Sequence, residues 1–337
     1  MKDEIATLLR CPGCGRTGCR ATATTRESGE IRDGRIECEA CHAEYPIINF
    51  IPRLVPADNY ASSFGFQWNL HARTQVDRAD EHLSHARFVG VTGWPEDLRG
   101  QRVLEAGSGA GRFTAIVVAT GAQVFTFDYS NAVDANLSNQ GLQPNLHLLQ
   151  ADIFRIPFAP GSFDKVVCLG VLQHTPDPAR AFQSLVDQVA PGGQIVIDVY
   201  RLKLNSFVSP KYLLRPITRR MPAQALYGLV SQTVRALLPV KRWLSDRVPF
   251  GRYPAHFIPV AYQTAWATLG ETVSEDRMVE LSVLDTFDWY APRFDKPQTR
   301  ARVQRWFEQA GLVDIEVKYG PNGIVGRGTK PTADRSR

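Results

Sequence analysis

Short apolar runs alternate with stretches of helical spacing between residues 103 and 200 of this 337-residue chain. Glycine, proline or acidic residues bound each apolar run, which is typical of buried strands. The predicted strands cover residues 103–104, 124–127, 146–149, 163–169 and 194–199. Helices are expected between them, at 113–120 and 179–189. Strands that alternate with helices in this way predict an α/β domain built on a parallel sheet.

The turn after the first predicted strand contains Gly107, Gly109 and Gly111. Glycine lets the backbone pass close to a ligand, because a Cβ there would clash or require an unfavourable φ. Asp128 ends the second predicted strand, where a carboxylate can hold a ribose diol. The segment therefore predicts a nucleoside site. Arg112 occupies the third glycine position of the dinucleotide fingerprint, which argues against a dinucleotide.

The segment Glu105–Gly111, EAGSGAG, resembles motif I of class I S-adenosylmethionine (SAM) methyltransferases, E/D-x-G-x-G-x-G. Residues 170–178, GVLQHTPDP, are similar to a segment of the same family, LHHTPDP. The resemblance implies a Rossmann-like fold that binds SAM. Glu105 precedes the first glycine, where it can face a cationic ligand.

By the same resemblance, Asp152 would accept a hydrogen bond from the adenine amine, and the amide of Ile153 would meet a ring nitrogen. His174 follows the fourth strand, where an imidazole could take a proton from an attacking hydroxyl. It could instead cap the next helix or orient SAM. Cys168 is expected to be a packed core thiol. The full implied cofactor set is Glu105, Gly107, Ser108, Gly109, Gly111, Asp128, Tyr129, Asp152, Ile153 and Leu169.

Two CxxC pairs precede this domain, Cys11 with Cys14 and Cys38 with Cys41. Four thiolates from two such turns predict a tetrahedral Zn²⁺ site. Cys19 lies outside both pairs and is expected to be a spare thiol, and His42 is a weaker alternative ligand. Residues 45–48 and 51–56, YPII and IPRLVP, resemble the zinc-ribbon methyltransferase-activator family, in which the ribbon covers an apolar face of a methyltransferase. A nucleic-acid-binding zinc knuckle is the alternative.

The expected domains are a zinc ribbon (1–58), a helical linker or cofactor flap (59–100), a methyltransferase domain (101–330) and a disordered tail (331–337). Residues 62–77 hold clustered aromatics and predict a flap over the methionine end of SAM, with Arg73 near its carboxylate. A helix that simply packs on the sheet is the alternative.

A helical lid is expected as an insertion at about 201–283, because the gap between strands is too long for an ordinary connection. Residues 201–252 hold eleven bases and one acid, Asp246, with apolar residues at helical spacing. This predicts contact with an anionic acceptor or a membrane surface, or else an ordinary helical cap with a basic face. Polar residues at 285–299 are either substrate contacts or a structural turn. The substrate candidates are Arg73, Asp288, Tyr290, Arg293 and Asp295.

Composition limits the function classes. A net charge of +5 is too small to imply nucleic acid by itself, and neither a run of about 18 apolar residues nor a signal-like start is present, so we expect a cytoplasmic protein. After the fourth strand there is neither the Asn/Asp-Pro-Pro-Tyr/Phe signature of adenine amino-methylation nor a Pro-Cys nucleophile. These absences narrow the acceptor. We expect methylation of a small, glycan-linked or lipid-linked acceptor, and favour oxygen as the methylated atom. An RNA base methyltransferase and a catalytically silent SAM-binding scaffold are the alternatives.

Overall fold

The computed structural model describes residues 1–56, 59–77, 83–203, 208–262 and 274–332, and contacts between residues divide the chain into two compact units. The first unit is Met1–Arg201 with Phe294–Arg337, and the second is Leu202–Arg293. The second unit thus ends ten residues beyond the insertion expected at 201–283. Most of the predicted disordered tail lies outside the described residues.

The first unit begins with a four-stranded antiparallel sheet in the order β1-β2-β3-β4. Its elements are α1 (Glu4–Leu8), β1 (Cys19–Glu27), β2 (Glu30–Cys38), β3 (Glu44–Ile48) and β4 (Ile51–Pro52). Alternating burial along β2 places Ile31 and Ile36 in a core with α1. That core continues into the larger sheet, since Leu54, Phe125 and Leu149 belong to the same apolar cluster.

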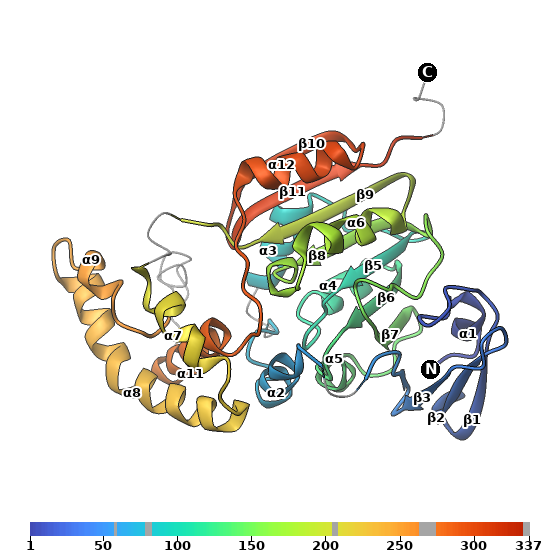
Figure 1. Ribbon diagram of the computed structural model, residues 1–337, viewed down its shortest axis with the longest axis horizontal. Coiled ribbons are helices and arrows are strands. Elements are labelled where there is room, and N and C mark those ends of the chain that lie inside the picture. Colours follow the sequence, from blue (N-terminus) through green and yellow to red (C-terminus); the bar gives the residue numbers. More distant parts are fainter. Residues whose placement is uncertain (57–58, 78–82, 204–207, 263–273, 333–337) are drawn as a thin grey trace. The chain divides into compact units, whose positions relative to one another are not determined.

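The seven-stranded sheet has the order β10-β11-β9-β8-β5-β6-β7 (Figure 1). Strands β5 to β9 are mutually parallel, and β11 runs antiparallel to both β9 and β10. The parallel α/β fold predicted from the apolar runs is confirmed. The strands are β5 (Arg102–Ala106), β6 (Gln123–Asp128), β7 (Leu146–Gln150), β8 (Phe163–Leu169), β9 (Val189–Val199), β10 (Val313–Gly320) and β11 (Gly323–Thr329).

Helices cover both faces of this sheet, because alternate strand residues face opposite sides. Leu104 belongs to the apolar cluster that includes α6 and α12, whereas Val103 belongs to the cluster with α3 and α4. Figure 1 places α6 and α3 on opposite faces. The helices of this unit are α2 (Ser62–Leu70), α3 (Leu83–Thr92), α4 (Thr114–Ala119), α5 (Val133–Gln140), η1 (Leu172–His174, a 3-10 turn), α6 (Pro178–Gln188) and α12 (Arg300–Gln309).

Strand β9 begins five residues before the strand expected at 194–199. Pro191–Gly193, which directly precede the predicted strand, form an irregularity inside β9. Pairing with β8 shifts register between Phe163 and Lys165. A Cβ on Gly193 would lie 2.8 Å from the carbonyl oxygen of Asp164, so the backbones approach closely here.

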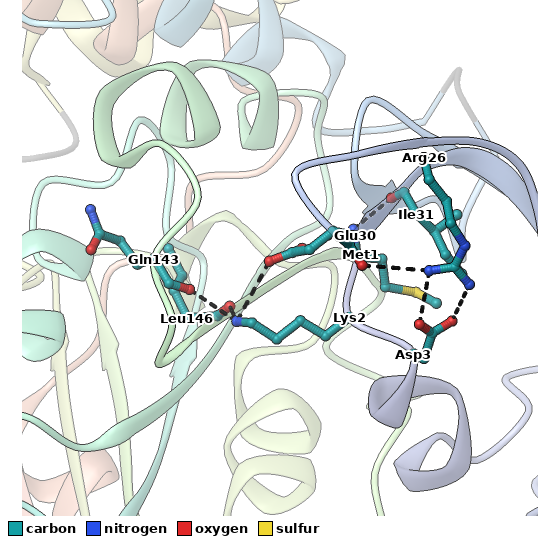
Figure 2. Close-up of polar contacts among 9 residues, drawn as sticks. Met1, Lys2, Asp3, Arg26, Glu30, Ile31, Gln143 and Leu146 are labelled. Atoms are coloured by element: carbon teal, nitrogen blue, oxygen red, sulfur yellow. Dashed lines mark hydrogen bonds and ion pairs between the residues drawn. The ribbon is translucent and has the colours of Figure 1, made fainter.

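The four-stranded sheet is fixed to the edge strand β7 by main-chain and side-chain contacts. Arg53 pairs with Gln150 in a parallel bridge, and the amide of Leu54 donates to the carbonyl oxygen of Gln150 (2.8 Å). In Figure 2 the ammonium of Lys2 reaches the carbonyl oxygens of Gln143 and Leu146, at 2.9 and 3.0 Å. The ribbon module and the large sheet therefore share both a core and a hydrogen-bonded edge.

The second unit is helical in its described residues. Its helices are α7 (Pro210–Thr218), α8 (Ala223–Arg247), α9 (Arg252–Ala255) and α11 (Glu275–Tyr290). Helix α8 packs Leu226, Val230, Val234 and Leu238 inward, but Leu229, which shares their apolar pattern, is half exposed. The segment expected as a turn or site loop from residue 285 is helical up to Tyr290, as the end of α11. None of the described helices has the length and apolar character needed to cross a bilayer.

Candidate functional site

The glycine turn lies at the carboxyl end of β5, between β6 and β8. Strand order reverses here, since β6 and β7 extend to one side of β5 and β8 and β9 to the other. Open α/β sheets bind ligands at this switch point. The amides of Gly107 and Ser108 both donate to the carbonyl oxygen of Phe127, at 2.7 and 3.2 Å. The turn is therefore fixed to the end of β6.

Two of the three glycines are required by close approach as well as by backbone angle. Gly107 has φ +80°, and a Cβ on it would lie 2.3 Å from a methyl carbon of Val171. Gly111 has φ +88°, and a Cβ on it would lie 2.3 Å from Asn136 Oδ1. An L side chain at either position would be strained and would displace a neighbour. The spacing recognised in the sequence thus has a steric cause.

Asp128 closes β6 and organises the turn opposite it. Its Oδ2 accepts the amide of Gly109 at 2.9 Å, and its Oδ1 accepts the amide and hydroxyl of Ser130 at 2.8 and 2.7 Å. Burial raises the pKa of this carboxyl, and these hydrogen bonds oppose the rise. Oδ2 keeps acceptor capacity beyond the Gly109 amide, as a ribose hydroxyl would require.

Glu105 lies inside the sheet, next to the glycine turn, with 4% of its surface exposed. Its Oε2 accepts hydrogen bonds from the hydroxyls of Thr114 (2.6 Å) and Thr126 (2.8 Å). Asn136 in turn donates to the Thr114 hydroxyl at 3.0 Å. Burial raises the pKa of Glu105 to about 7, although both threonine hydrogen bonds act against the rise. A cation beside this carboxyl would favour its charged form.

Helix α2 lies over the glycine turn. A Cβ on Gly109 would lie 3.3 Å from the indole nitrogen of Trp68, and one on Gly65 would collide with Asn131. Asn69 completes the attachment by donating to the carbonyl oxygen of Asn131 at 3.0 Å. The segment expected to be a flap is thus a helix that contacts the glycine turn itself.

Aromatic rings gather beside the ends of β6 and β7. Tyr60 stacks on Tyr129, with ring centroids 4.6 Å apart, and meets Phe294 edge-on at 5.5 Å. Burial raises the pKa of the Tyr60 hydroxyl, and the nearby carboxylates of Asp152 and Asp128 raise it further. Tyr60 therefore shares a neighbourhood with the predicted ribose and adenine ligands. No sequence motif marks it, so the prediction missed it.

His174 ends the short turn η1 after β8 and is almost fully buried. Its Nδ1 lies 3.1 Å from the carbonyl oxygen of Phe294. Because a carbonyl can only accept, Nδ1 carries the proton in this contact and Nε2 is left as the basic nitrogen. Capping of the next helix is done by Asp177, whose Oδ1 accepts the amide of Arg180. The suggestion that His174 caps α6 was therefore wrong.

Several buried polar atoms near the glycine turn lack hydrogen-bond partners, which indicates whether a polar ligand would fit there. Among the described residues, Ser108 Oγ, Gln67 Oε1 and both amide atoms of Gln173 are buried without a hydrogen-bond partner. Buried polar groups are normally satisfied, so such a group requires an explanation. Ser108 belongs to the glycine turn, Gln67 to the helix over it and Gln173 precedes His174. A polar ligand such as SAM would meet this need, and only Ser108 was predicted.

The remaining predicted residues are described one by one. Ile153, three residues after β7, is buried, and Leu169, the last residue of β8, is half-buried. Arg73 is exposed just after α2. In the second unit, Arg293 is exposed, Asp288 is half-buried, and Tyr290 is buried and donates its hydroxyl to the carbonyl oxygen of Pro259 at 3.0 Å. Their role in binding substrate stays a prediction.

The four predicted metal ligands come together. The sulfurs of Cys11, Cys14, Cys38 and Cys41 all lie within 4.8 Å of one another, with Cys11–Cys41 at 3.6 Å and Cys14–Cys38 at 3.7 Å. Four sulfurs around Zn²⁺ at about 2.3 Å would be separated by about 3.8 Å in a tetrahedron. The observed spacing fits that geometry closely.

The surroundings of the cluster favour thiolates at Cys11. Burial opposes ionisation of Cys11, but hydrogen bonds from the Tyr45 hydroxyl and from backbone amides lower its pKa to about 6. Cys19 is buried outside the cluster and burial raises its pKa to about 11, as expected for a spare thiol. His42 is exposed beside Glu37 and is not part of the cluster in the described residues.

The sheet order, the glycine turn and the acid at the end of β6 define a Rossmann-like α/β protein with a candidate nucleoside site. Residues 104–197 match the family model described as "Methyltransferase domain". This part of the chain is a class I SAM-dependent methyltransferase domain, which confirms the resemblance drawn from motif I.

Curated relatives match the same region. The chain is 31% identical over 130 residues to a ubiquinone biosynthesis O-methyltransferase of Aromatoleum aromaticum, covering 36% of this chain and 55% of the relative. The corresponding enzyme of Stutzerimonas stutzeri is 28% identical over 153 residues, covering 43% and 60%. The chain thus spans little more than half the length of these relatives.

Among solved structures, the chain is similar to a complex of the Haloferax volcanii Trm112 methyltransferase activator with a candidate methyltransferase. Sequence identity is 13% and the TM-score is 0.43, with 82% of this chain and 99% of the other covered.

Proposed function

We propose that this chain is a SAM-dependent O-methyltransferase whose acceptor is a small molecule, free or linked to a lipid or glycan. The carrying observation is the glycine turn held by Asp128 inside a segment that matches the methyltransferase domain family. The named activity of the curated relatives, O-methylation, favours oxygen as the methyl-accepting atom.

The residues around the turn would hold SAM by its distinct parts. Asp128 would accept from the ribose, Asp152 and the Ile153 amide would meet the adenine, and Tyr60 would pack beside it. Glu105 lies where its carboxylate would balance a positive charge. SAM, when bound, supplies a methyl group already activated by the sulfonium.

The chain's own contribution to the transfer is positioning and removal of a proton. His174 keeps Nδ1–H on the Phe294 carbonyl, so Nε2 would accept the proton of an acceptor hydroxyl. Helix α2 brings Phe64 to this ring and Trp68 to the glycine turn, which would exclude water from the site.

We further infer that the four-cysteine cluster holds one structural Zn²⁺. All four ligands would be thiolates, which leaves no open position for substrate. The ion would stabilise the ribbon that is attached to β7, and the chemistry would remain at the glycine turn.

The decisive experiment measures SAM binding by calorimetry and methyl transfer with radiolabelled SAM on the same preparation. We expect SAM and its demethylated product to bind and NAD to fail. Asp128→Asn keeps one acceptor oxygen for the turn and should weaken SAM binding at least tenfold, by loss of a charge-assisted hydrogen bond. Asp97→Asn is the matched control, since Asp97 is exposed and pairs with Arg99.

Acceptor panels separate the competing activities. Methyl transfer to hydroxylated aromatic, glycan or lipid acceptors supports the proposal, whereas transfer to RNA bases supports the alternative nucleic-acid activity. SAM binding without transfer to any class favours a silent scaffold. Binding of NAD in place of SAM contradicts the proposal altogether.

A further inference from the structure

Exposed apolar side chains concentrate in the second unit. Seventeen large hydrophobic residues are exposed among those described, and eleven of them lie between Leu202 and Arg293. That unit is little more than a quarter of the chain. They are Leu202, Val208, Leu213, Leu214, Ile217, Leu229, Val240, Trp243, Phe250, Tyr253 and Phe257. Scattered single exposures need no explanation, but exposed apolar residues that adjoin one another mark an interaction surface.

Helix α7 has the reverse of the usual polarity. Its basic residues Lys211 and Arg215 are buried, while Leu213 and Ile217 are 63% and 68% exposed. The Arg215 guanidinium donates to the carbonyl oxygens of Trp289 and Pro292 at 2.7 Å each, so it holds α7 against α11. Burial of the charged face directs the apolar face outward, which a helix facing only water would not do.

A group of four exposed aromatics, which we call the aromatic end, lies where α8 meets α9. Trp243, Phe250, Tyr253 and Phe257 are 60%, 82%, 75% and 61% exposed. The amide of Tyr253 donates to the carbonyl oxygen of Phe250, and the amide of Phe257 donates to that of Pro254. Tyr253 lies in α9, and Phe250 and Phe257 lie two residues before and after this short helix. Gly251 packs closely on the carbonyl oxygen of Leu244, which places the segment from Phe250 beside the turn of α8 that carries Trp243.

The segment that carries α7, α8 and α9 has a charge that complements an anionic surface. Residues 208–262 contain nine lysines and arginines and one acid, Asp246. Asp246 accepts a hydrogen bond from Tyr262. Arg247 and Arg252 are exposed within the sequence of the aromatic end, and Arg219 and Arg220 are exposed just after α7. Exposed bases therefore adjoin both apolar surfaces.

We propose that the aromatic end docks on the surface of an anionic phospholipid bilayer. Tryptophan and tyrosine prefer the headgroup region, and arginines attract anionic lipids. A second copy on a two-fold axis would bring Arg247 and Arg252 of both chains together, which is unfavourable. The phosphate backbone of a nucleic acid offers no apolar surface to Leu213 or Ile217.

This inference deepens the proposed methyl transfer and rests on it in one respect. If the chain is a methyltransferase, bilayer docking identifies the acceptor as a lipid-borne molecule presented at a membrane surface. Docking itself requires neither SAM nor acceptor, so it can be tested separately from catalysis.

The test is flotation of the full chain with vesicles of phosphatidylcholine alone and of phosphatidylcholine with one quarter phosphatidylglycerol. We expect flotation with the anionic vesicles and at least tenfold weaker binding to the neutral ones. Phe250→Ser with Tyr253→Ser should abolish flotation. Leu142→Ser with Tyr319→Ser, which alters exposed apolar residues of the first unit, should leave it unchanged.

Charge is tested with Arg247→Gln and Arg252→Gln. Each basic contact near an anionic surface contributes about fivefold, so the double variant should bind the anionic vesicles about 25-fold more weakly. Absence of flotation, an equal loss in the Leu142 and Tyr319 control, or a dimer that disappears with Phe250→Ser would overturn docking. Binding of the aromatic end to RNA instead of vesicles would do the same. SAM calorimetry on each variant shows separately whether the cofactor site persists.

Discussion

The ring of Phe64 meets the imidazole of His174 edge-on, with centroids 5.0 Å apart. Phe64 comes from α2, before the first strand of the large sheet, and His174 comes from the turn after β8. Tyr200, at the end of β9, contacts the same imidazole at 5.3 Å. Two aromatic rings therefore contact the proposed base, one from α2 and one from the residue after β9. Helix α2 is thus part of the site.

Phe64→Ala should lower kcat/KM for methyl transfer about tenfold. Without the ring, water can enter the site and the imidazole of His174 can adopt a second orientation. SAM affinity should change little, since Trp68, which covers Gly109, is retained. Steady-state kinetics with calorimetry measures both. Leu70→Ala is the control, because Leu70 lies on the same helix but is exposed. An equal loss in both variants would mean that α2 acts only through folding.

His174→Ala should reduce kcat by 10²-fold or more while SAM binding persists, as expected for loss of a general base. His174→Gln separates the roles, since an amide can still donate to the Phe294 carbonyl but cannot take a proton at neutral pH. Recovery of the rate in His174→Gln would assign His174 to positioning alone.

The sequence predicted those site residues that belong to a short local motif. Gly107 and Gly111 are recognisable because only glycine fits beside Val171 and Asn136. Asp128 is recognisable because it ends a short apolar run. Tyr60, in contrast, reaches the site through the fold of a linker that has no periodicity.

Burial was harder to predict than element type. Leu226 and Leu229 both fit the helical spacing of apolar residues in α8, yet only Leu226 is buried. On α7 the packing of Arg215 against α11 carbonyls decides which face is inside. Which face of a helix is buried depends on contacts with residues distant in sequence, so the periodicity of apolar residues does not predict it.

Zinc removal should destabilise the ribbon. Cys14→Ser is expected to lower zinc content from about one ion per chain toward zero, because a tetrahedral thiolate site loses a ligand. Amide exchange should then increase along β2, which carries Cys38. Cys19→Ser is the control, since Cys19 is buried outside the cluster and should leave zinc content unchanged. Zinc loss of the same size in Cys19→Ser would contradict the four-ligand assignment.

Stability should fall as pH rises from 4.5 toward 7 through Glu105. Burial raises its pKa from 4.5 to about 7, so folding favours the protonated form. The stability gained by protonation is fully present below pH 4.5 and is lost as pH rises through 7, at a cost of about 3 kcal/mol. Glu105→Gln is neutral at every pH and should therefore raise Tm at pH 8 more than at pH 5.

The same carboxyl should make SAM binding depend on pH in the opposite sense. A cationic ligand favours ionised Glu105, so the Kd of SAM should fall as pH rises from 6 to 8. In Glu105→Gln the Kd of SAM should depend less on pH, and the Tm at pH 8 should rise. Together these results would show that Glu105 favours SAM binding at a cost in stability. Asp97→Asn serves as the control, because Arg99 holds the pKa of exposed Asp97 at about 2, outside this range. If Glu105→Gln keeps the wild-type pH dependence of SAM binding, the carboxyl does not face the cation.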